Sequence, residues 1–300
     1  MAGRGSMGGR WRRTVAAGVA FGSAAASTQA ASAQAFGAAR VPRLARPQDA
    51  RPQTARTRAV ALRLRPRAGD TVRTRFEQTV RYARRDAPTP EAVTPASAML
   101  VIARSIVERV DATGAELLAL TDSVAFSAAG APPAVVERMR RGMQGRRAQL
   151  HVAPDGALAA TGGPLGVTAT LRLPGTLPTT VVAPGATWHR AMAVPSWGPA
   201  ATPPHLDVAF RFDSVAADGG RAYISLRGRV HDDATGADDV ASDAPAGGAG
   251  QVDGALVVDL VRGWVVESWA TFRLDGMMVS APGAAPAPVR VVVTQHLRAY

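Results

Sequence analysis

The side chains of this chain that could do chemistry form no recognisable catalytic or metal-binding motif. None of the five histidines lies in a His-Glu-x-x-His or similar paired spacing, and there is no cysteine to serve as a metal ligand. A Gly-x-Ser-x-Gly elbow is absent, and a Ser-x-x-Lys pair is impossible because the chain has no lysine. We therefore predict no catalytic residue, no metal ligand and no cofactor. The histidines are His151, His189, His205, His231 and His296.

Acidic residues are concentrated in the segment 231–250, which is also rich in alanine and glycine. Their spacing does not follow the Asp-x-Asp-x-Asp-Gly frame of a calcium loop, and no glutamate stands at the closing position. We interpret 231–250 as a disordered surface loop, and calcium binding remains the alternative. Its acidic residues are Asp232, Asp233, Asp238, Asp239 and Asp243.

Other acidic residues lie in or beside predicted strands, where an outward-facing position explains them more simply than a glycosidase-type carboxylate pair. These residues are Glu108, Glu116, Asp207 and Glu267. Asp122 differs because it takes an apolar position in the alternation of its strand, which is typical of a strand end or a bulge. Tryptophans of the second half, which would suit a sugar or acyl groove, are more commonly core residues. They are Trp188, Trp197, Trp264 and Trp269.

The elements that would position these residues are mainly β-strands. After Arg58 the sequence alternates between apolar and polar residues, and the clearest example is 70–84, with Phe76, Val80 and Tyr82 on one face. Turn residues such as Pro154-Asp155-Gly156 separate the strands, and short turns imply antiparallel pairing. The pattern predicts about twelve strands, over 60–64, 70–84, 99–110, 118–126, 148–152, 167–173, 188–194, 206–212, 222–230, 255–261, 266–274 and 289–297.

One segment departs from the alternation. Residues 132–142 begin with proline, end with glycine and place Val135, Val136 and Met139 on one helical face, which predicts a short helix. A single helix among a dozen strands is too few for repeated βαβ units, so we predict a mainly β fold.

Similar turn-and-strand pieces recur about 105 to 116 residues apart, for example around Gly69 and Gly185. They suggest two similar halves, 59–165 and 175–300, within one β domain spanning 59–300. Chance similarity between hairpins in a biased composition is the alternative.

The first 35 residues are typical of a cleavable secretory signal. Four arginines precede the uncharged stretch Thr14–Ala26, which is too short to span a membrane, and small residues then offer cleavage after Ala33 or Ala35. The pair Arg12-Arg13 also permits the twin-arginine route. We expect a periplasmic or secreted protein with no transmembrane segment in its mature chain.

The net charge of +12 would suit a nucleic-acid-binding protein, but its distribution argues against that class. Residues 1–90 carry 18 arginines and 4 acidic residues, whereas 91–300 carry 17 arginines and 19 acidic residues. Much of the excess of positive charge lies in the signal and in the Arg- and Pro-rich segment 36–58. We predict this segment to be a disordered linker. Adhesion of this linker to anionic envelope surfaces is the alternative to a simple tether.

The order of elements resembles that of uncharacterised secreted or periplasmic bacterial β-rich proteins. The resembling pieces are Arg63 and Pro66 with Gly69-Asp70-Thr71, Gly145, Pro154-Asp155-Gly156, Pro184-Gly185-Ala186-Thr187-Trp188, and Gly254 through Gly263 to Trp264. More distantly, the chain resembles LolA/LolB-type half-barrel envelope proteins. That resemblance implies a curved antiparallel sheet or half-barrel that holds an acyl chain, although here only one helix and no cysteine anchor are visible.

We therefore expect an exported, non-catalytic binding module for an apolar or lipid-like ligand. A structural or protein-interaction component of the cell envelope is the alternative, and a hydrolase whose acidic residues come from distant positions is a remote one. The oligomeric state is left open.

Overall fold

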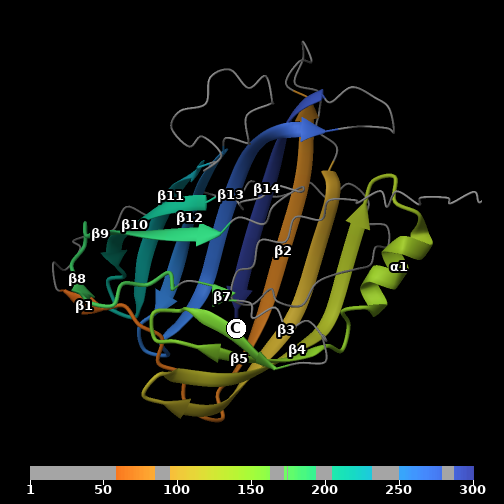
Figure 1. Ribbon diagram of the computed structural model, residues 1–300. Coiled ribbons are helices and arrows are strands. Elements are labelled where there is room, and N and C mark those ends of the chain that lie inside the picture. The colour runs from red at the N-terminus through yellow and green to blue at the C-terminus, as the bar shows by residue number, and fades with distance from the viewer. Residues whose placement is uncertain are drawn as a thin grey trace, which may run out of the picture.

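The fold is a single curved antiparallel sheet with a small second sheet and a short helix. The computed structural model describes residues 59–84, 95–162, 172–173, 175–193, 205–231, 250–278 and 287–300. Within these residues twelve strands form the main sheet and two more form the small sheet. Figure 1 shows the long strands side by side and strongly curved. The predicted mainly β, curved-sheet fold class is confirmed.

Apart from β7 and β9, which lie at opposite edges, strands that follow one another in sequence are neighbours in the main sheet. Its order is β7-β6-β5-β4-β3-β2-β14-β13-β12-β11-β10-β9. Their bounds are β2 Thr71–Arg84, β3 Pro95–Asp111, β4 Gly114–Ala128, β5 Arg147–Val152, β6 Leu158–Gly162, β7 Arg172–Leu173, β9 Thr187–Ala193, β10 His205–Val215, β11 Arg221–His231, β12 Gly250–Asp259, β13 Trp264–Met278 and β14 Ala287–Ala299. The small sheet pairs β1, Val60–Ala61, with β8, Val181–Val182.

The main sheet consists of two meanders of six strands each, β2–β7 and β9–β14. They join at the centre, where β14 pairs with β2 from Ala299↔Thr74 to Val289↔Arg84. The strands at the two edges are therefore β7 and β9. These meanders fall within the predicted halves 59–165 and 175–300 except that β7 lies between them, and a repeat relating the halves stays a prediction.

The short turns all lie at one end of the sheet, which we call the closed end. They are 111–114, 153–157, 216–220 and 260–263, and each joins two neighbouring antiparallel strands. At the other end the β4–β5 connection, 129–146, is described, whereas the connections 85–94, 163–171, 194–204, 232–249 and 279–286 lie outside the described residues. Most of the predicted loop 231–250 is among them, although His231 ends β11 and Gly250 begins β12.

Alternate residues of the strands face a common apolar core. Its largest cluster includes Leu150 and Leu158 from one wing of the sheet and Phe210 and Phe212 from the other, so the two wings curl around the same core. Leu177, fully buried, belongs to this cluster although it lies outside the main strands. A smaller cluster forms around Phe76, Val101, Ala103, Val124, Met143 and Leu297.

The helix α1 spans Pro133–Arg141 and confirms the helix predicted over 132–142. Proline stands in its first turn, and Gly142 follows its last residue. It lies beside β4, as Figure 1 shows, and the chain after it buries Met143 in the smaller core cluster.

The strand predictions differ from the structure at three places, one of which is the two-residue strand β8, Val181–Val182, that the sequence did not predict. The strand expected over 60–64 ends at Ala61, because Leu64 and Arg65 donate their backbone N–H groups to Pro154 and Gly263 at two different turns instead of to a neighbouring strand. The strand β6 was missed, since its sequence Leu-Ala-Ala-Thr-Gly has only one β-branched residue and no aromatic one.

Candidate functional site

Two segments cross the closed end of the sheet and pack over its core. The first, residues 59–66, which we call the crossing segment, runs between the β12–β13 and β5–β6 turns. Leu64 N–H donates to Pro154 O at 2.7 Å, and Arg65 N–H donates to Gly263 O at 3.0 Å. The second, residues 175–186, which we call the strap, leads from the β7 edge to the β9 edge. The two segments meet where β1 pairs with β8.

Side chains of β9 hold the strap in place from one edge of the sheet. Trp188 Nε1 donates to Thr176 O at 2.9 Å, while Arg190 donates to Gly175 O and Leu177 O, both at 2.9 Å. From the other wing, Asp155 O in the β5–β6 turn accepts the Leu177 N–H at 2.9 Å. The strap thus links the two wings of the open sheet.

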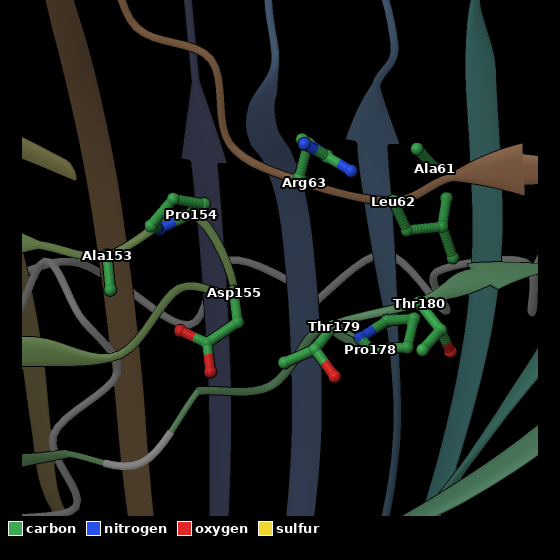
Figure 2. Close-up of a pocket in the computed structure, with 9 residues that line it drawn as sticks. All are labelled: Ala61, Leu62, Arg63, Ala153, Pro154, Asp155, Pro178, Thr179 and Thr180. Atoms are coloured by element: carbon green, nitrogen blue, oxygen red, sulfur yellow. The ribbon is translucent and has the colours of Figure 1, made fainter. Parts of the chain in front are cut away.

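A half-open cavity of about 370 Å³ lies between the crossing segment, the strap and the β5–β6 turn. Figure 2 shows 61–63 above it, 153–155 to the left and 178–180 below. Five lining residues are apolar and four are polar or charged. The lining is Ala61, Leu62, Arg63, Ala153, Pro154, Asp155, Pro178, Thr179 and Thr180. An apolar cavity with a few polar groups is the usual composition of a small-molecule site, and this volume is near the lower limit of such sites.

The outer face of the sheet carries charged side chains in cross-strand pairs. His296 Nε2 lies 2.9 Å from Glu267 Oε1, and Arg298 Nε donates to the same oxygen at 3.1 Å. Burial acts to raise the pKa of Glu267, but the hydrogen bonds from His296 and Arg298 outweigh it, so this pKa is lowered. Such pairs on a solvated face stabilise the charged carboxylate and need no bound ligand to explain them.

Other described acidic residues also pair with basic side chains on the same or a neighbouring strand. Glu116 pairs with His151 at 3.1 Å on β4 and β5. Asp122 is the extra residue of a β-bulge opposite Ile102–Ala103, one of the two alternatives that its position in the alternation predicted. It forms an ion pair with Arg104 at 3.1 Å. In the described part of the chain no three metal-ligating side chains come together.

The three described tryptophans of the second half, Trp188, Trp264 and Trp269, do not line one groove. Trp188 stacks on Phe210 with ring centroids 5.7 Å apart, and Trp264 packs against the large core cluster. Trp269 pairs with His296 across two strands, and its buried Nε1 has no hydrogen-bond partner. Trp197, the acidic residues of 232–249 and the cleavage positions Ala33 and Ala35 lie outside the described residues.

Sequence reasoning did not single out the cavity. It is lined by ordinary small, apolar and polar residues that come together only because two segments cross, and no local motif marks them. Pro154-Asp155-Gly156 was recognised, but only as a turn.

No family model and no curated protein match this chain. The resemblance to half-barrel envelope proteins therefore stays a prediction. No helix among the described residues is long and apolar enough to span a membrane.

Proposed function

We propose that this chain is an exported, non-catalytic binding protein that holds a small apolar or lipid-like ligand in the cavity at the closed end of its half-barrel. The observation that carries the proposal is the cavity itself, whose apolar lining by Ala61, Leu62 and Pro178 is bordered by a few polar groups. The strap and the crossing segment, both hydrogen-bonded to the turns or strands beneath them, hold these walls in a fixed arrangement.

The binding function is tested with the mature chain, residues 36–300. Organic extraction and mass spectrometry of the purified protein should recover a small apolar molecule, and a fluorescent fatty-acid probe should bind with saturation. The Thr179→Trp variant places a large side chain at an exposed position of the cavity wall and should abolish probe binding. The matched control is Ala112→Trp in the exposed β3–β4 turn, which should bind normally. Equal binding by both variants would place the ligand elsewhere, and no binding by the wild type would refute the proposal.

Export is tested separately. The full chain, expressed in a bacterium with a functional secretion pathway, should appear outside the cytoplasm with a new N-terminus at Gln34 or Phe36, corresponding to cleavage after Ala33 or Ala35. N-terminal sequencing of the recovered protein measures this directly. An uncleaved protein retained in the cytoplasm would contradict export.

One observation favours a second function, that of an envelope interaction protein. Among the described strands β9 pairs only with β10, so one side of its backbone is available for an added strand. The Ala191→Lys variant, which places a charge at an exposed edge position, should then abolish copurification of a specific partner while leaving cavity binding intact. Unchanged copurification would exclude this edge as the interface.

A further inference from the structure

The crossing segment, 59–66, and the residue after it present a row of three arginines at the closed end. Leu62 and Leu64 are buried in the core, and the residues that alternate with them, Arg63, Arg65 and Arg67, are exposed. Of these three, Arg63 lines the cavity. Among the described residues no ion pair involves any of the three arginines.

The acidic residues near this row are occupied by backbone hydrogen bonds of the turns. Asp155 Oδ1 accepts the Ala157 N–H at 3.0 Å, and Asp70 Oδ2 accepts the Arg67 N–H at 2.9 Å. Asp259 Oδ1 accepts two N–H groups of the β12–β13 turn, each at 2.9 Å. These carboxylates keep their negative charge, and Asp155 itself lines the cavity, but each is held at its turn by backbone hydrogen bonds. The three arginines form no ion pair among the described residues, so the guanidinium of Arg63 can donate hydrogen bonds to a negatively charged ligand.

From this arrangement we propose that the ligand of the cavity is a single-chain amphiphile with an anionic head group, which Arg63 recognises at the cavity mouth. The inference rests on the proposed binding function and names its ligand class. Ala61, Leu62 and Pro178 contact the chain, and the hydroxyl groups of Thr179 and Thr180 donate further hydrogen bonds to the head group. Carboxylate and phosphate heads both satisfy a guanidinium in this way.

The first experiment compares head groups on one chain length. Dodecanoate and dodecyl phosphate are measured against dodecanol and dodecyltrimethylammonium by displacement of the fluorescent probe, below their micelle concentrations. The anionic compounds should bind about three- to tenfold more tightly than the neutral one, the range expected of a partly exposed charge contact, and the cationic compound most weakly. The preference should shrink at high salt. Comparing the two anionic compounds distinguishes a fatty-acid ligand from a phosphate-bearing one.

The second experiment removes the charge at two matched positions. Arg63→Gln should bring the affinity for dodecanoate down to that for dodecanol, and Arg63→Glu should favour the cationic compound. Arg65→Gln removes the same charge from a neighbouring exposed residue that does not line the cavity, and it should keep the preference. An equal loss in Arg63→Gln and Arg65→Gln would overturn the inference, because it would indicate a general field rather than recognition by Arg63.

The outcomes distinguish recognition of an anionic head group from the proposed binding of an apolar ligand in the cavity. If dodecanol and dodecanoate bind equally well in the cavity, the anionic head group is refuted and the binding function stands. If none of the four dodecyl compounds binds, both the anionic head group and the binding function are refuted. Binding to phosphatidylglycerol vesicles without uptake of dodecanoate would assign the arginine row to a membrane surface and would also overturn the inference.

Discussion

Arg190 occupies a core-facing position of an edge strand, where an unpaired charge would be unfavourable. Its guanidinium instead donates to two carbonyl groups of the strap, Gly175 O and Leu177 O. Gly175 and Leu177 are buried, so these carbonyls have little access to water. The residue therefore connects the strap to the sheet through charge-assisted hydrogen bonds, which are stronger than neutral ones.

Replacing Arg190 by methionine should lower the free energy of unfolding by about 2–3 kcal/mol, because buried carbonyl groups lose their donors while the apolar stem is kept. Urea denaturation followed by circular dichroism measures this change. The control is Arg227→Met at an exposed position of β11, expected to change stability by less than about 0.5 kcal/mol. Equal effects of the two substitutions would show that the strap does not depend on Arg190.

The Glu267 carboxylate gives a pH dependence with a definite sign. Burial acts to raise its pKa, but the hydrogen bonds from His296 and Arg298 outweigh burial and hold the pKa below its ordinary value of 4.5. The resulting stabilisation is therefore present above about pH 4.5 and is lost as the pH falls through the lowered pKa. In Glu267→Gln the free energy of unfolding should fall less than in the wild type as the pH is lowered from 5 through the lowered pKa of Glu267. Urea denaturation across that pH range measures this difference. A profile identical to that of the wild type would contradict the assignment.

At the scale of elements, the crossing segment depends on a close approach between two backbones. Gly263 has a φ of +66°, and a Cβ built on it would lie 2.4 Å from Arg65 N. An alanine there has to displace the crossing segment as well as adopt a left-handed conformation. Gly263 thus fixes the position of one wall of the cavity.

Gly263→Ala should therefore destabilise the protein more than Gly219→Ala, whose φ is +75° but whose added Cβ would contact nothing within 4 Å. We expect about 1 kcal/mol for Gly219→Ala from backbone strain alone and about 2–4 kcal/mol for Gly263→Ala. Thermal and urea denaturation of the two variants give the comparison. Probe binding should weaken only in Gly263→Ala, and the same stability for both would exclude the contact.

The elements that the sequence predicted well are those whose signals are local. Alternation in 70–84 predicted β2, and the proline and glycine around 132–142 predicted α1, because each pattern reports which face of one element is buried. The apolar position of Asp122 in the alternation similarly predicted a strand end or a bulge, and the structure has a bulge there. The cavity was not predictable in this way, since Leu62, Asp155 and Pro178 are brought together by the crossing of distant segments. The alternation of Leu62 and Leu64 even indicated a strand, whereas these residues bridge two turns.

At the scale of the whole molecule, the topology makes the two meanders depend on one another. The first strand of the first meander, β2, pairs with the last strand of the second, β14. Without this pairing each meander would expose an unpaired strand edge at the centre of the sheet. In each, the third and fourth strands are joined by a long segment, which contains α1 in the first and is 232–249 in the second. The strap between β7 and β9 connects the outer edges through the chain, while the pairing of β2 with β14 joins the meanders at the centre.

The shared core predicts a single cooperative unfolding transition. Val80, Leu117 and Leu150 from the first meander belong to the same cluster as Phe210 and Val293 from the second, so neither half can bury its apolar face alone. Every described tryptophan lies in the second meander, and its fluorescence therefore reports on that half, whereas far-UV circular dichroism reports on both.

In urea the two signals from the mature chain should give the same midpoint, and residues 59–173 expressed alone should not fold. A fluorescence midpoint separated from the circular dichroism midpoint, or a folded fragment 59–173, would show instead that the halves are independent domains. In that case the cavity, whose walls include 61–63 and 153–155 from the first half and 178–180 from the strap, would lie between two separately folding units rather than within one.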